Sequence, residues 1–99
     1  MEKIKKINQE FKTNGYTYQL IERIENIVLY KGIDKDLVIV WEVHKIRIQK
    51  IPEQWKKNQL YKGFDEWERL AGNEDFGKYG WSYQTEELAR KKMMETVNL

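Results

Sequence analysis

Cysteine, histidine, serine and long apolar runs are scarce in this 99-residue chain, and each scarcity excludes some chemistry. The absence of cysteine excludes disulfides and thiolate catalysis, and it fits an intracellular protein. The single histidine, His44, and the single serine, Ser82, lack the neighbours that general-base or nucleophilic sites require. No apolar run reaches the roughly 20 residues of a membrane span, and none follows the charged start as in a signal peptide. We therefore expect a cytoplasmic, non-enzymatic protein without metal or other cofactor and without membrane contact.

The residues that are present predict one folded domain spanning residues 1–99. Hydrophobic residues make up 40% and aromatic residues 13% of the chain, which is typical of a globular core and not of a disordered tail. A chain of this length forms a single domain. The 18 Lys and Arg nearly balance the 16 Asp and Glu, leaving a net charge of +2. Dedicated nucleic-acid-binding domains are usually more basic than this.

The pattern of apolar residues predicts an α+β fold with an antiparallel meander of about four strands. Residues 16–24 alternate in β-forming residues, and residues 27–30 form a second strand after a tight turn at Glu25-Asn26. A last strand is expected around residues 79–83, where three aromatic residues alternate. A closing helix over residues 85–97 then packs on one face of the sheet.

Residues 37–49 carry the longest strand pattern of the chain. Residues 32–36 suit the hairpin loop before it. The apolar spacing changes from two to three between Val43 and Ile46, so either a β-bulge near His44-Lys45 restores the register or the strand changes its buried face. Pro52 ends the strand because it cannot donate to the ladder.

Three helices are expected, and for two of them a non-helical structure is an alternative. The spacing of Ile4, Ile7 and Phe11 predicts a short N-terminal helix over residues 2–13, ended by Asn14-Gly15, with a loose arm as the alternative. Residues 65–71 read as a short helix or as an irregular extended segment.

The closing helix has the clearest signals. Thr85 suits its N-cap, and acidic residues follow in the first turn. Its apolar stripe is expected to consist of Leu88, Ala89, Met93 and Val97.

The basic residues gather in one segment. From His44 to Lys62 the chain has six basic residues against one acid, Glu53. Basic side chains can hold a phosphate backbone while aromatic rings stack on bases. The candidate nucleic-acid-binding residues are Lys45, Arg47, Lys50, Trp55, Lys56, Lys57, Tyr61 and Lys62.

An acidic segment follows directly. From Asp65 to Asp75 there are five acids against one base, Arg69. Such a patch can steer a basic protein partner toward aromatic anchors. The candidate protein-binding residues are Phe64, Asp65, Glu66, Trp67, Glu68, Glu74 and Asp75. The alternative is that this face is merely solvated, and that the acidic and basic segments compensate each other within the fold.

Three stretches resemble parts of small uncharacterised single-domain proteins of bacterial phages and other mobile elements. They are YTYQL at 16–20 with IVLY at 27–30, WEVHKIR at 41–47, and EDFGKYGWSY at 74–83. The resemblance carries no activity and no functional residue. It implies a context in which small proteins work as inhibitors or adaptors by binding.

We therefore expect a binding protein that inhibits or modulates a host macromolecule, such as a defence system, by protein–protein contact. One alternative is a small nucleic-acid-binding module that uses residues 44–62. Another is an oligomer that sequesters a small ligand in an aromatic-lined pocket between subunits. The sequence leaves the oligomeric state open.

Overall fold

A computed structural model describes residues 3–13 and 15–98 of the chain. The chain forms two compact units, and each unit is assembled from two separate segments. The small unit comprises Met1–Ile7 and Arg47–Arg69, and the large unit comprises Asn8–Ile46 and Leu70–Leu99. Each unit has a β-sheet of its own. The fold class is α+β, as predicted, but the sequence undercounts the strands, because eight strands form two sheets.

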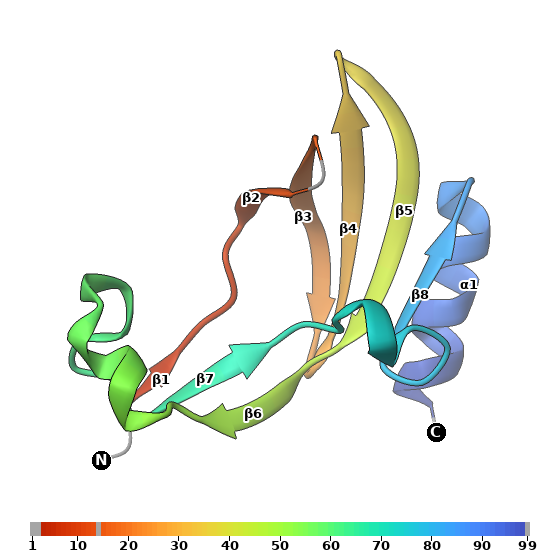
Figure 1. Cartoon of the computed structure of the whole chain (residues 1–99). Coiled ribbons are helices and arrows are strands. Elements are labelled where there is room, and N and C mark those ends of the chain that lie inside the picture. The colour runs from red at the N-terminus through yellow and green to blue at the C-terminus, as the bar shows by residue number, and fades with distance from the viewer. Residues whose placement is uncertain (1–2, 14, 99) are drawn as a thin grey trace. The chain divides into compact units, whose positions relative to one another are not determined.

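The sheet of the large unit is antiparallel and has the order β2-β3-β4-β5-β8 (Figure 1). Strands β2 to β5 form a meander, and β8 joins β5 after a long connection. Its strands are β2 (Glu10–Thr13), β3 (Tyr16–Ile24), β4 (Ile27–Asp34), β5 (Leu37–Lys45) and β8 (Gly80–Tyr83). The predicted strands at 16–24, 27–30 and 79–83 are confirmed, with β4 extended to Asp34. Period-two alternation identifies β3, whereas β4 begins with four consecutive buried residues, 27–30, because both of its faces are covered there.

The hairpin between β4 and β5 is tighter than predicted. Lys35 and Asp36 form its two-residue turn, with φ of +50° and +69°, and Gly32 belongs to β4 rather than to a loop. A Cβ atom at Gly32 would lie 2.5 Å from a side-chain methyl of Val40 and 3.0 Å from the ring of Tyr18. Glycine is therefore needed at this position because neighbouring side chains approach the backbone closely, and not because the chain turns there.

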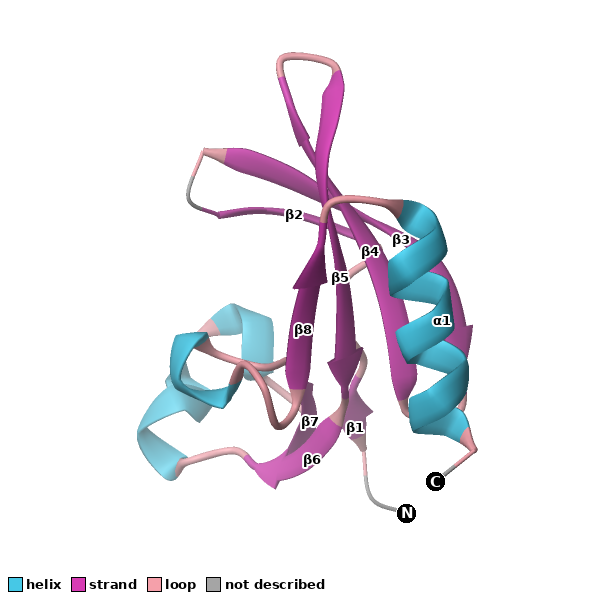
Figure 2. Ribbon diagram, turned by 90° about the vertical axis from the view of Figure 1, so that its right-hand side faces the viewer, coloured by secondary structure: helices cyan, strands magenta, loops and turns pink. Residues whose placement is uncertain are grey.

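Helix α1 (Glu86–Val97) covers one face of the five-stranded sheet (Figure 2). Thr85 caps it by accepting a hydrogen bond from the backbone N–H of Leu88 (3.3 Å), which confirms the predicted helix start. The core lies between helix and sheet and consists of Ile27, Leu29, Val43, Ala89 and Met93. Leu88, predicted in the apolar stripe, is 51% exposed. The prediction was wrong for Leu88 because the buried face runs through Ala89, Met93 and Thr96 instead.

No bulge lies at His44-Lys45 in the described sheet. Strand β5 ends at Lys45, and after Ile46 the chain enters β6 (Arg47–Lys50), which belongs to the sheet of the small unit. The change of apolar spacing therefore marks a change of sheet, and the expected continuous strand over 37–49 is wrong. The register shifts lie elsewhere, between Leu20 and Glu22 and between Gly32 and Ile33.

The small unit is a three-stranded sheet with two short helical turns. Its strand order is β1-β7-β6, in which β1 (Ile4–Lys5) runs parallel to β7 (Glu66–Arg69) and β6 runs antiparallel to it. The segment after Pro52 forms the 3₁₀ turns η1 (Glu53–Lys57) and η2 (Gln59–Tyr61). A third such turn, η3 (Asn73–Asp75), belongs to the large unit.

Two predicted helices are absent from the described residues. Residues 4–5 and 10–13 of the expected N-terminal helix are strands, while residue 2 and Asn14 lie outside the described residues. Residues 66–69 are also a strand, so the extended alternative for that segment was the better one. A strand supplies the backbone partners of each segment: β7 for residues 4–5, and the directly following β3 for residues 10–13. Such pairing overrides a helical spacing of apolar residues.

Candidate functional site

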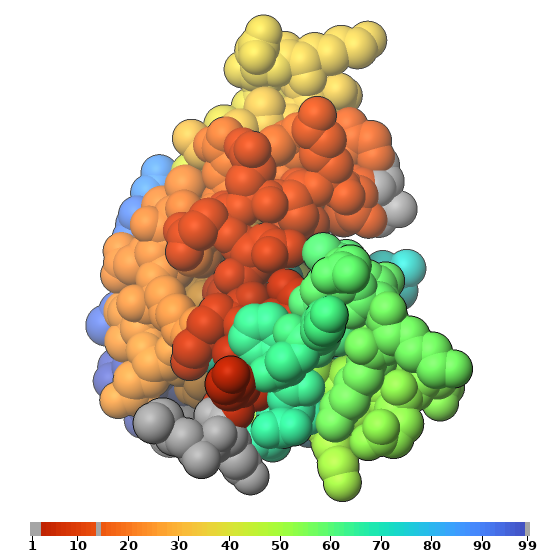
Figure 3. Space-filling view, turned by 90° about the vertical axis from the view of Figure 1, so that its left-hand side faces the viewer, coloured from red at the N-terminus to blue at the C-terminus, as the bar shows by residue number. Residues whose placement is uncertain are grey.

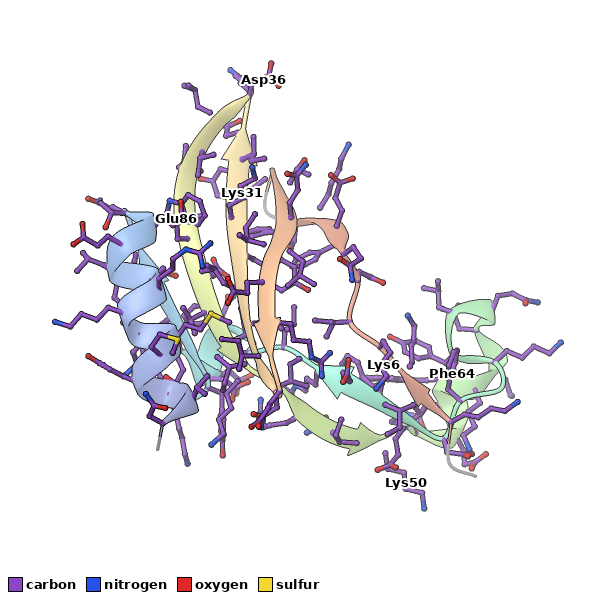
Figure 4. The ribbon with its side chains drawn as sticks, turned by 180° about the vertical axis from the view of Figure 1, so that it is seen from behind. Lys6, Lys31, Asp36, Lys50, Phe64 and Glu86 are labelled. Atoms are coloured by element: carbon purple, nitrogen blue, oxygen red, sulfur yellow. The ribbon has the colours of Figure 1, made fainter. Side chains whose placement is uncertain are left out.

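The acidic candidate residues fall into both units. Phe64, Asp65, Glu66, Trp67 and Glu68 belong to the small unit, and Glu74 and Asp75 to the large unit. Figure 4 labels Phe64, which is half-buried, beside the turns of the small unit. The predicted acidic run is thus divided at the point where the chain passes from one unit to the other.

Two of these acids bind backbone groups instead of facing solvent. Glu68 is only 5% exposed, and its Oε1 accepts a hydrogen bond from the N–H of Ile7 (3.1 Å) while Lys6 lies 3.7 Å from Oε2. Asp75 accepts a hydrogen bond from the N–H of Gly72 (3.0 Å). The description of Glu68 as part of a solvated acidic face is therefore wrong. Its carboxylate ties the N-terminal segment to β7.

All but one of the candidate nucleic-acid-binding residues lie in the small unit. Lys45 belongs to the large unit, whereas Arg47, Lys50, Trp55, Lys56, Lys57, Tyr61 and Lys62 belong to the small one. In the sequence of the small unit nine Lys and Arg stand against five Asp and Glu; the large unit has the remaining nine and eleven. Lys56 pairs with Glu53 (3.4 Å) and lies 3.7 Å from Asp65. The excess of positive charge thus belongs to the small unit.

The aromatic candidates Trp55 and Tyr61 pack together with Trp67. Their ring centroids are 5.5 Å apart for Trp55 and Tyr61, 5.8 Å for the two tryptophans, and 6.3 Å for Tyr61 and Trp67. Contacts of this geometry stabilise a fold beyond the area they bury. Trp55 and Tyr61, which were predicted to stack on nucleic-acid bases, therefore pack with Trp67 in an aromatic cluster of the small unit.

A pocket of about 610 Å³ lies within the large unit. Alternation along β4 and β5 points Leu29 and Val43 toward α1, so Glu42 and His44 project from the opposite face, which carries the pocket. Its lining residues are Phe11, Thr13, Tyr18, Glu42, His44, Leu70, Ala71, Gly72, Asn73, Phe76 and Ser82.

A chain of hydrogen bonds runs through this pocket. The hydroxyl of Tyr18 donates to Glu42 Oε2 (3.1 Å), and His44 Nε2 lies 2.9 Å from Glu42 Oε1. On the other side of the ring, the backbone N–H of Ala71 donates to His44 Nδ1 (3.1 Å). These hydrogen bonds join β3, β5 and the segment before η3, so they hold three parts of the pocket lining together.

The positions of the protons in these hydrogen bonds follow from the groups that can only donate. A backbone N–H can only donate, so Nδ1 of His44 accepts, and Nε2 carries the proton that is donated to Glu42. His44 is therefore neutral in this arrangement, and neither ring nitrogen has a lone pair left for a substrate proton. Burial, the charge of Glu42 and the hydrogen bond to it raise the pKa of Tyr18 to about 12, so its phenol stays protonated at neutral pH. Glu42 is then the anion of the group.

Sequence reasoning missed Tyr18 and Glu42 as site residues. The available signal was the spacing of Glu42 and His44, because residues two apart on a strand share a face. A carboxylate and an imidazole on one face of a strand full of apolar residues mark a polar site. The contribution of Ala71 had no signal, because it depends on a backbone contact across 27 residues.

Comparisons with protein-family models, curated proteins and solved structures find no match. Within residues 3–13 and 15–98, no group of three or more His, Asp or Glu side chains is placed to hold a metal ion. Of the helices in the same part of the chain, none is long and apolar enough to cross a membrane.

Proposed function

We propose that this protein is a non-enzymatic binding protein that acts by contact with another protein, through the tip of the β4–β5 hairpin. The observation that supports this proposal is the exposure of three consecutive large aliphatic side chains. Leu37 is 68% exposed, Val38 44% and Ile39 39%. The yellow atoms at the top of Figure 3 are this tip. We call these three residues the aliphatic tip.

The pairing of β5 explains why the aliphatic tip is uncovered. Strand β8 pairs with β5 from Trp41 to His44, so among the described strands residues 37–40 have a neighbour on the β4 side alone. The register shift leaves Ile39 opposite no residue of β4. A bulge of this kind discourages another strand from adding to the edge and re-aims side chains. Side-chain contact is therefore the mode of binding that fits the tip.

An apolar groove on a protein is the occupant that suits this tip. Full burial of one large aliphatic side chain is worth about 1.5–3 kcal/mol. Asp34, Lys35 and Asp36 beside the tip carry a net negative charge, which disfavours anionic lipid surfaces and phosphate backbones. Figure 4 shows Asp36 at the end of the hairpin. In the phage or mobile-element context, the partner is a cytoplasmic host protein that this chain inhibits.

The test compares three forms of the protein. The double variant Leu37→Ser with Ile39→Ser removes the aliphatic tip, and Leu88→Ser removes an aliphatic side chain of similar exposure from α1. A protein recovered from a bacterial cytoplasmic extract by the wild type and by Leu88→Ser, but lost with the double variant, is then purified. Its dissociation constant should rise about tenfold or more in the double variant.

Equal recovery or equal affinity for all three forms overturns the proposal. Sedimentation velocity supplies a second check. If the wild type dimerises at micromolar concentration and the double variant stays monomeric, the tip binds a second copy of this chain, and the proposal of a foreign partner fails.

A second candidate function is nucleic-acid binding by the small unit, which its excess of positive charge favours. Lys57 and Lys62 are exposed there. Binding through phosphates falls steeply with salt, and replacing both lysines by Gln should lower the salt slope by roughly 1–2 units. A flat salt response, or no binding at low salt, removes this candidate.

A further inference from the structure

The pocket of the large unit has the lining of a cation site. We propose that it binds a small organic cation, with an alkylammonium or guanidinium group held against Glu42 and the surrounding aromatic rings. This goes beyond the proposed function, because none of the three tip residues lines the pocket and the cation is a different class of ligand.

The lining carries one negative charge and no positive one. Its described residues include Glu42 but neither Lys nor Arg. The two oxygens of Glu42 accept from a phenol and from a neutral imidazole, so hydrogen bonds stabilise the carboxylate while its charge remains. Each carboxylate oxygen retains acceptor capacity beyond one bond. A cation in the pocket would compensate the charge of Glu42, whereas a phosphate or carboxylate would be repelled by it.

Three aromatic side chains line the same pocket. Phe11 stacks on Tyr18 with centroids 5.2 Å apart and an interplanar angle of 15°. Phe76 is 37% exposed and meets His44 at 5.7 Å in an edge-to-face arrangement. The faces of aromatic rings attract cations, most strongly where water is displaced. The rings therefore favour an organic cation, whose apolar surface they can cover, over a hydrated metal ion.

The pocket is larger than a bare ammonium group. Its volume of about 610 Å³ lies in the range of sites for small organic ligands. Thr13, Asn73 and Ser82 add neutral hydrogen-bonding groups to the lining. The ligand we infer is therefore a cationic head attached to a short polar body.

Choline and 3,3-dimethylbutan-1-ol provide a matched pair of probes, because they share a shape and differ in charge. Binding to the wild-type protein is followed by chemical-shift changes of the pocket amides. Choline should bind about tenfold more tightly than the alcohol, which corresponds to the cation–π and carboxylate contributions. Equal binding of the two probes, or no shift at about 50 mM choline, overturns the proposal.

Two variants locate the site. Glu42→Gln keeps the shape of the side chain and removes its charge, so choline affinity should fall about tenfold. Glu74→Gln removes an exposed acid of η3 outside the pocket and should leave the affinity unchanged. If Glu42→Gln fails to fold, Phe76→Ala serves instead, because this ring is partly exposed, and the affinity should fall about threefold. Wild-type affinity in the folded pocket variants overturns the proposal.

The cation can come from a free molecule or from a basic side chain of a peptide. Titrations of choline and of the N-acetyl methylamides of lysine and arginine separate these sources. Tighter binding of choline indicates a free molecule, and tighter binding of an amino-acid amide indicates a peptide side chain. The tip variant Leu37→Ser with Ile39→Ser should bind choline like the wild type. Failure of the cation site and failure of the protein-binding tip are therefore distinguishable.

Discussion

The two units of this protein are stabilised by different kinds of contact. Of the ten buried hydrophobic residues in the described part of the chain, only Ile51 belongs to the small unit. The large unit has an aliphatic core between α1 and the sheet. The small unit relies on its aromatic cluster, on the buried carboxylate of Glu68 and on backbone bonds such as that from Asp65 N–H to the carbonyl of Lys3 (3.0 Å).

The stability of each unit therefore has a different source. Apolar burial is the dominant favourable contribution to folding, and segments of fewer than about 40 residues rarely bury enough apolar area alone. The segments of the small unit lie below that length. We therefore expect the small unit to open at a lower free energy than the large one, as a separate cooperative region.

The largest effect is expected from shortening a buried side chain in the core of the large unit. Leu29→Ala creates a cavity in the core and should lower the free energy of unfolding by about 2–5 kcal/mol. Leu88→Ala, on the exposed side of α1, should change it by less than about 0.5 kcal/mol. Urea unfolding followed by circular dichroism measures both. Similar losses in the two variants would mean that the core does not lie between α1 and the sheet.

The next test acts on the small unit. Glu68→Lys places a cation where a buried carboxylate accepts the N–H of Ile7, and should cost about 2–3 kcal/mol. Hydrogen exchange should accelerate at β1 and β7 and stay unchanged at β4. Glu53→Lys is the matched control, because the side chain of Glu53 is 87% exposed. Equal acceleration in both units would show that they open together.

The smallest expected effect concerns the pocket wall of the large unit. The phenol of Tyr18 loses its proton near the ordinary pKa of 10 when unfolded and near a pKa of about 12 when folded. The contribution of the protonated phenol to the free energy of unfolding is therefore fully present below pH 10. About 2 kcal/mol of it is lost as the pH rises to 12. Tyr18→Phe should lack this part of the pH dependence. Urea unfolding between pH 8 and pH 12 compares the two, and parallel curves would contradict the prediction.

The sequence predicts the large unit better than the small one, for a physical reason. Strand β3, strand β4 and helix α1 carry their signals locally: alternation in β3, a continuous apolar run in β4, and the Thr85 cap of α1. Strands β1 and β7 are two and four residues long, and each is specified by a partner far away in the chain. Short strands of this kind have too few residues to show a period.

The candidate site was predictable only in part. His44 was recognised as the only residue of its type, and its i,i+2 spacing from Glu42 was visible in the sequence. The contacts that give the two residues their roles were not, because Tyr18 and Ala71 approach them through tertiary structure. The division of the acidic run between two units was hidden for the same reason.

The parallel pairing of Ile4 with Glu66 determines when the small unit can form during synthesis. After β1 has been made, a nascent chain lacks its partner until about 60 further residues have followed, whereas β3, β4 and β5 are joined by tight turns and can pair as they emerge. At ribosomal rates of about 5–20 residues per second, β1 waits several seconds for β7. During that interval the backbone groups of Ile4 and Lys5 lack their strand partner.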